Sequence, residues 1–112
     1  MMKMTDKIYF VYIVRCVDNT LYCGITTDVE RRLAEHNAGT GAKYTRGRRP
    51  VTLKAFWQMD GRGLALREEY RIKHLSKCDK LLLIEQFNKD EMERCKADPK
   101  YFMNRYCVIK NK

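Results

Sequence analysis

Arg32 and His36 stand four residues apart in a segment that reads as a helix, so their side chains share one helical face. The helix follows Gly24, and the free N–H groups of a helix N-terminus favour an anion. A guanidinium and an imidazole at this place indicate a site for a negatively charged group. The alternative is a solvated cationic face with Glu30 and Glu35 as local partners, because charged helix faces are common.

A second cationic stretch follows in the loop at 39–50, which has no acidic residue between Gly41 and Lys54. Basic side chains around an aromatic ring on a loop suit a nucleic-acid backbone with one stacked base. The alternative is a loop that serves solubility alone. The candidate nucleic-acid-binding residues are Lys43, Tyr44, Arg46, Arg48 and Arg49.

Two adjacent carboxylates, Glu68 and Glu69, lie in a second predicted helix. A carboxylate at the boundary of a core could bind a metal ion. More often it pairs with a neighbouring cation, and Arg71 and Lys73 are close in sequence. The helical wheel alone does not choose between the two glutamates. Two strand tyrosines, Tyr12 and Tyr22, are by position alone more typical of a core, with the hydroxyl bound to one partner.

The composition agrees with a nucleic-acid partner. The chain has 112 residues, 45% hydrophobic and 33% charged, and a net charge of +9, which favours polyanionic partners. Its length suits one domain with one core. No apolar run reaches the roughly 20 residues of a membrane span, and no signal peptide is recognised. The five cysteines are scattered, which predicts reduced thiols and a cytoplasmic location rather than disulfides or a zinc site.

The pattern along the chain predicts three strands and three helices. Strands are expected at 8–16, 20–25 and 51–58, and helices at 28–38, 64–76 and 77–88. Thr27 and Glu30 have the spacing of a capping box, and Gly39 should end the first helix. The order β-β-α-β-α-α predicts an α+β fold with a small three-stranded antiparallel sheet flanked by helices. A domain at 8–88 would be followed by an extension at 89–112, made of a short helix and a tail.

Four of these motifs occur in one order: "FVYIV" at 10–14, "YCG" at 22–24, "GITTDVERRLAEH" at 24–36 and "ALREE" at 65–69. Together they resemble the GIY-YIG nuclease family over roughly residues 8–85, and the short stand-alone members above all. "YCG" stands in place of the family's YIG. "ALREE" matches the family's A-L-x-x-E helix, and this match selects Glu69 over Glu68.

The resemblance implies an endonuclease that hydrolyses phosphodiester bonds in DNA with one divalent metal ion, Mg²⁺ or Mn²⁺. Glu69 would hold the metal and Arg32 would contact the scissile phosphate. Tyr12 would activate or position the attacking water, and Tyr22 would orient the water or the phosphate. His36 would be an alternative base or a partner of Tyr12. Members of the family include the nuclease module of bacterial excision repair and enzymes that cut branched DNA, so the resemblance implies branched or damaged DNA in repair or recombination as a substrate.

Two departures from the family pattern affect these expectations. Val11 or a neighbour stands where the family has the glycine of GIY, and Asn88 lies too far along the chain to match an asparagine found in several relatives. No separate DNA-recognition domain is present, so the chain should bind DNA weakly or use a partner protein for targeting. A module that binds nucleic acid without catalysis is the alternative function.

A site that uses both tyrosines sets a condition on the hairpin between the first two strands. A two-residue loop at Asp18 and Asn19 would place Tyr12 and Tyr22 on opposite faces of the sheet. We therefore predict a register offset by one residue, from an odd loop or a bulge with Asn19 in the left-handed region.

Overall fold

The computed structural model describes residues 7–97 and contains the expected sheet. Its strands are β1 (Ile8–Arg15), β2 (Leu21–Thr26) and β3 (Thr52–Asp60), all antiparallel in the order β2-β1-β3. The central strand β1 is apolar at consecutive positions, and Val11 to Val14 are buried on both faces, as its sequence predicts. The α+β fold expected from the sequence is confirmed.

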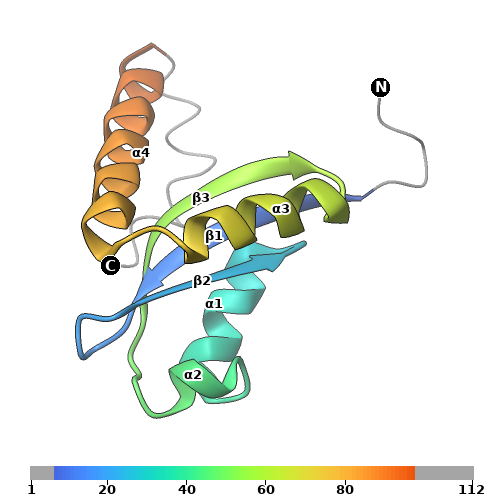
Figure 1. Cartoon of the computed structure of the whole chain (residues 1–112), viewed down its shortest axis with the longest axis vertical. Helices are drawn as coiled ribbons and strands as arrows, with labels where there is room; N and C mark the ends of the chain where they lie inside the picture. Colours follow the sequence, from blue (N-terminus) through green and yellow to red (C-terminus); the bar gives the residue numbers. More distant parts are fainter. Residues whose placement is uncertain (1–6, 98–112) are drawn as a thin grey trace.

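The helices are α1 (Val29–Ala38), α2 (Lys43–Arg46), α3 (Arg62–Lys73) and α4 (Lys77–Ala97). Figure 1 shows α3 running along the strands and α1 and α2 grouped below β2. Helix α4 lies at the upper left of the view, away from the other three helices. Phe87 of α4 packs against Phe56 and Trp57 of β3, at ring-centroid distances of 5.1 and 5.8 Å. None of these helices within residues 7–97 is long and apolar enough to cross a membrane.

The hairpin between β1 and β2 has the predicted offset. Cys16 N–H donates to Thr20 C=O at 2.8 Å, which leaves three residues in the loop, and Asn19 has a φ of 69°. The strands then pair Tyr12 with Gly24, so Tyr12 and Tyr22 lie on the same face. The prediction that an odd loop brings both tyrosines to one face is confirmed.

Cys23 lies on the face of β2 opposite to that of Tyr22, and the two faces of the sheet are covered by different helices. Tyr12 contacts His36 of α1, whereas burial raises the pKa of the Cys23 thiol to about 12 and the charge of Glu69 on α3 raises it further; Figure 1 shows α3 in front of the strands. Helices α1 and α3 therefore cover opposite faces of the sheet. Because β2 is an edge strand, long side chains from the two faces can approach each other around it.

The ends of two helices differ from expectation. The predicted capping box is wrong: Asp28, not Thr27, is the N-cap of α1, and its carboxylate accepts from Arg31 N–H at 3.0 Å. Gly39 ends α1 as expected, with a φ of 84°. Helix α4 continues past residue 88 to Ala97, so the short helix expected in the extension is its second half. Residues 98–112, with the expected tail, lie outside the described residues.

Candidate active site

His36 is the centre of the site and is fully buried between two hydroxyl groups. The Tyr12 oxygen lies 2.8 Å from its Nε2, and the Thr45 oxygen lies 2.7 Å from its Nδ1. The Tyr22 ring packs edge-on against the imidazole at a centroid distance of 5.5 Å. Strands β1 and β2 thus supply the two tyrosines, α1 supplies the histidine, and α2 supplies a threonine that sequence reasoning did not include.

Gly24 gives Tyr12 the space that it occupies in this arrangement. The two residues are cross-strand partners, and a Cβ atom at position 24 would lie 2.6 Å from the Tyr12 hydroxyl oxygen. Packing therefore explains the glycine of the "YCG" motif, because the Tyr12 side chain lies over the backbone of Gly24 and leaves no room for a Cβ atom.

Arg32 lies beside the Tyr12 hydroxyl at the partly exposed margin of the site. Its guanidinium donates to Glu35 Oε1 at 2.9 Å, and it lies close enough to Tyr12 to lower the pKa of that hydroxyl. Burial outweighs this contact and raises the pKa of Tyr12 to about 12. Burial is also the main reason that the pKa of His36 falls to about 4, and the charge of Arg32 lowers it further. Both groups are therefore neutral at pH 7.

Tyr22 is held from its outer side by a stack of side chains. Its ring lies 5.7 Å from that of Tyr44 at an interplanar angle of 22°. Arg48 places its guanidinium carbon 4.0 Å from the centre of the Tyr44 ring and donates to Asp18 Oδ2 at 3.1 Å. The ring of Tyr44, which the sequence suggested for stacking on a base, already contacts two side chains of the protein.

The two glutamates of α3 have different surroundings. Glu68 accepts two hydrogen bonds from Arg71, at 2.6 and 3.0 Å, and this pairing lowers the pKa of its carboxyl group. Glu69, whose side chain is 18% exposed, forms an ion pair with Lys73 at 3.3 Å. The Lys73 ammonium lies 5.8 Å from the centre of the Tyr22 ring. Lys73 therefore links Glu69, across the edge of β2, to the tyrosine on the other face.

The carboxylate of Glu69 is a ligand of the kind that a hard cation such as Mg²⁺ prefers, and it would supply only a small part of the coordination shell. Within residues 7–97 no three histidine, cysteine or acidic side chains come together as a metal cluster. Mg²⁺ in enzymes that act on phosphates is commonly held by one or two carboxylates, several waters and the substrate. The single carboxylate of Glu69 fits that mode of binding, and a site made wholly of protein ligands does not fit.

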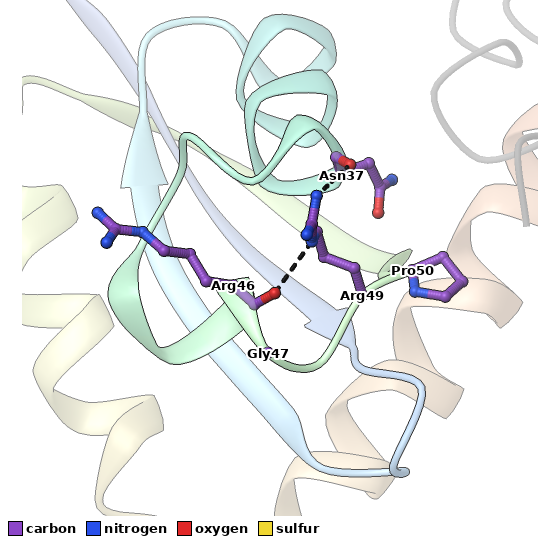
Figure 2. Close-up of a pocket in the computed structure, with 5 residues that line it drawn as sticks. All are labelled: Asn37, Arg46, Gly47, Arg49 and Pro50. Atoms are coloured by element: carbon purple, nitrogen blue, oxygen red, sulfur yellow. Dashed lines mark hydrogen bonds between the residues drawn. The ribbon is translucent and has the colours of Figure 1, made fainter.

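The cations of the basic loop fall into two groups. Arg49 donates to the main-chain oxygens of Arg46, at 2.9 Å, and Asn37, at 3.5 Å (Figure 2). Arg48 donates to Asp18 and to the Tyr44 carbonyl. For Lys43 and Arg46 no ion pair or side-chain hydrogen bond is found with the described part of the chain.

An open surface pocket borders this loop. Figure 2 shows the Arg46 side chain pointing away from Arg49. Arg49 instead lies against the C-terminal end of α1, and a Cβ atom at Gly39 would be 2.7 Å from its Nη1. Arg49 therefore uses its guanidinium for bonds within the protein, whereas Arg46 is exposed and its charge faces solvent. The lining residues are Asn37, Arg46, Gly47, Arg49 and Pro50.

Two residues of the site escaped sequence reasoning. Thr45 is completely buried, but α2 has only four residues and no periodic pattern that would predict it. The small pair Gly41-Ala42 before it was the only local signal. A Cβ atom at Gly41 would lie 2.6 Å from His36 Nδ1, so the chain must pass close to the imidazole there. The sequence showed Lys73 only as one of the cations close to the two glutamates, and it gave no sign of the contact of Lys73 with Tyr22.

Known proteins are similar to this chain in sequence. The family model for the GIY-YIG catalytic domain matches residues 8–81. A UPF0213 protein of Halobacterium salinarum is 58% identical over 72 residues, which cover 64% of this chain and 94% of that protein. A UPF0213 protein of Staphylococcus haemolyticus is 53% identical over 78 residues, covering 70% and 95%.

A solved structure is also similar. The solution NMR structure of the protein EF2693 from E. faecalis is 39% identical in sequence. It covers 79% of this chain and 92% of its own, with a TM-score of 0.52.

Proposed function

The chain belongs to the GIY-YIG catalytic domain family, and from that premise we propose that it is a divalent-metal-dependent endonuclease that hydrolyses phosphodiester bonds in DNA. The observation that carries the proposal is the hydrogen bond of Tyr12 with the buried His36, with the charge of Arg32 close enough to lower the pKa of Tyr12. A pure binding module needs cations but does not need a buried tyrosine hydroxyl joined to a neutral imidazole.

A proton path follows from this contact. Tyr12 is neutral at pH 7, so it can accept a proton from the attacking water only while it passes its own proton to His36 Nε2. His36 is a weak base in the free protein because it is buried and lies near the charge of Arg32. A phosphate bound at Arg32 would offset that charge and raise the proton affinity of His36. The base would then become effective when substrate is present.

Arg32 has the position to stabilise the transition state. Its guanidinium is bonded to Glu35, lies near the Tyr12 hydroxyl and is partly exposed, so a phosphate could approach it from solvent. Negative charge increases on the phosphate oxygens as water attacks, and a fixed cation beside them is worth most at that moment. Tyr22, packed on His36 and Tyr44, would hold the phosphate or the water in line.

Glu69 is the residue that would hold Mg²⁺ or Mn²⁺, with waters and the substrate as its other ligands. When bound, the cation supplies Lewis-acid polarisation of the phosphate and stabilises the leaving oxygen. Glu69 would exchange its pairing with Lys73 for this role. Lys73 would then be free to contact a phosphate oxygen beside Tyr22.

The substrate in this proposal is DNA, bound mainly through its backbone, and branched or damaged DNA in repair or recombination is the class that we favour. Lys43 and Arg46 are exposed on α2, the helix that also carries Thr45, and would contact flanking phosphates. Few such contacts predict weak binding with little sequence preference, or targeting by a partner protein. The proposal places this activity in the cytoplasm, where the buried thiols of Cys16 and Cys23 would stay reduced.

A non-catalytic nucleic-acid-binding module is the second candidate, and one observation favours it. Glu69 is neutralised by Lys73 in the free protein, so a cation must compete with an ammonium group for the same carboxylate. If that competition is lost, the same surface binds DNA without cutting it.

Nicking of supercoiled plasmid distinguishes the two functions. The wild type, Tyr12→Phe and the exposed control Tyr70→Phe are compared in Mg²⁺, in Mn²⁺ and in EDTA, beside a binding assay. The endonuclease proposal expects nicking by the wild type and by Tyr70→Phe only when metal is present, and none by Tyr12→Phe. Binding without nicking in either metal would favour the second candidate.

A further inference from the structure

Thr45 makes the second hydrogen bond of the His36 imidazole, on the side away from Tyr12. Both side chains are fully buried, and the Oγ1–Nδ1 distance is 2.7 Å. A neutral imidazole carries one proton, on either Nδ1 or Nε2, and its hydrogen-bond partners decide which nitrogen holds it. The proton on this ring determines whether Nε2 can accept a proton from Tyr12.

The contacts of Thr45 place that proton. Its hydroxyl lies 3.0 Å from the Ala42 carbonyl oxygen, which can only accept. Two oxygen atoms at that distance without a proton between them would repel, so the single hydroxyl proton of Thr45 points to Ala42. Thr45 Oγ1 must then accept from His36, and the imidazole proton is on Nδ1.

The contacts of Tyr12 lead independently to the same tautomer. The Tyr12 hydroxyl has one proton to donate, and its hydrogen bond within the described part of the chain is with His36 Nε2. Tyr12 is 2% exposed, so its proton does not point to solvent and lies toward His36 Nε2. Nε2 can accept that proton only if the imidazole proton is on Nδ1. Two different neighbours of the ring therefore require the same arrangement.

We propose that Thr45 is a positioning residue that fixes His36 in the Nδ1–H tautomer, so that Nε2 is kept open for the proton of Tyr12. The inference rests on the proposed function only for its catalytic consequence; the tautomer itself is a property of the resting protein. When Nε2 receives the proton, the imidazolium donates from both nitrogens, to Thr45 and to Tyr12. No bond other than O–H and N–H changes in this step, and the proton lost by water is the net proton gained by His36.

The path of the chain supports a dedicated role for this threonine. A Cβ atom at Gly41 would lie 2.6 Å from His36 Nδ1 and 2.9 Å from its Cα, so only a glycine lets the loop pass this close. That approach brings Ala42 and Thr45 to the imidazole. Helix α2 thus meets the site through the backbone at Gly41 and through the Thr45 hydroxyl, which bonds to both His36 and Ala42. The cations of this helix, Lys43 and Arg46, are exposed to solvent.

The test reads the tautomer directly, by ¹H–¹⁵N correlation of the His36 imidazole at pH 7. The wild type and Thr45→Ser, which keeps the hydroxyl, should show the Nδ1–H tautomer. Thr45→Val keeps the shape without the acceptor and should show a loss of that tautomer. The same change at exposed Thr40, Thr40→Val, is the matched control and should leave His36 unchanged.

Single-turnover cleavage adds the catalytic consequence. Thr45→Val should lose roughly 10²-fold in rate with unchanged DNA affinity, and Thr45→Ser should recover most of it. A wild-type Nε2–H tautomer, or an unaltered His36 spectrum in folded Thr45→Val, would overturn the proposal. Should Thr45→Val fail to fold, the wild-type and Thr45→Ser spectra still decide it. An absence of cleavage in all proteins, with the expected tautomers, would refute the endonuclease and leave the positioning role supported.

Discussion

Gly24 of β2 is paired directly opposite Tyr12 of β1, and a single methyl group at Gly24 would lie 2.6 Å from the Tyr12 hydroxyl. The hydroxyl is fixed on its far side by His36 at 2.8 Å, so the ring cannot move without breaking that hydrogen bond. The motif glycine and the candidate catalytic pair are therefore one packing unit.

Gly24→Ala should destabilise the fold by about 1–3 kcal/mol, the usual cost of adding a carbon to a packed core. It should also abolish cleavage, because Tyr12 must leave His36. Gly63→Ala is the matched control: nothing lies within 4 Å of a Cβ atom there, and the residue is in α3, so the change should stabilise by up to about 1 kcal/mol. Urea unfolding of both variants, beside plasmid nicking, tests this, and equal stabilities would contradict the packing account.

Glu69→Gln should remove metal-dependent cleavage, by roughly 10²-fold or more, and leave folding intact. The change keeps the shape of the side chain but removes the charge that would hold the cation. Glu68→Gln is the control, because Glu68 pairs with Arg71 and should affect rate little. Mn²⁺ binding, measured beside single-turnover cleavage, separates loss of metal from loss of DNA. An inactive Glu68→Gln with an active Glu69→Gln would show that the motif was assigned to the wrong residue.

The basic loop should behave as two groups of cations. Lys43→Gln with Arg46→Gln should weaken binding of every DNA equally and lower the slope of log K against log salt by roughly 0.7–0.9 per phosphate contact. Arg49→Gln should instead lower the free energy of unfolding by about 1 kcal/mol, because its bonds are to the carbonyls of Arg46 and Asn37. Binding at several salt concentrations and urea unfolding test both. An unchanged salt slope in the double variant would make the loop a solvated surface only.

The difference between these two groups marks a limit of sequence reasoning. The four cations of the loop look alike in sequence, and the partner of Arg48, Asp18, is 30 residues away. Only the tertiary fold brings them together. Helix α2 was missed for a related reason, since four residues give no periodicity, and Thr45 was missed with it. Composition can count charges, but it cannot tell which of them the protein uses for its own bonds.

The strand β1, the hairpin loop and the first helix could be predicted, because each depends on a local sequence pattern or on a single geometric requirement. The continuous apolar run of β1 predicted a strand covered on both faces. The need to bring Tyr12 and Tyr22 together predicted the odd hairpin loop, with Asn19 in the left-handed region. The first helix was predicted well, but its cap was wrong because Asp28 stands next to Thr27 and both are good N-cap residues.

Stability should fall as pH is lowered, because His36 is buried in its neutral form. Its pKa is about 4 in the folded protein and about 6.5 in the unfolded chain, so only the unfolded chain is protonated between these values. The contribution of neutral His36 to the free energy of unfolding is fully present above pH 6.5 and decreases by roughly 3 kcal/mol down to pH 4. Urea unfolding between pH 4 and 7 should show a smaller dependence for His36→Gln. Equal pH dependence of the two proteins would mean that His36 is protonated normally.

Arg32→Ala should reduce the rate of cleavage far more than the affinity for DNA, because the guanidinium contributes mainly when charge develops on the phosphate. The same change should raise the pKa of His36, since the charge of Arg32 is the second cause of its low value; burial, the first cause, remains and keeps the pKa below 6.5. An NMR titration of His36 in Arg32→Ala and in the wild type measures this without any cleavage. Glu30→Ala, on the same helix, is a control that should leave the His36 titration unchanged. Equal losses of rate and affinity would make Arg32 a binding residue, and an unchanged His36 titration would mean that its charge does not act on the imidazole.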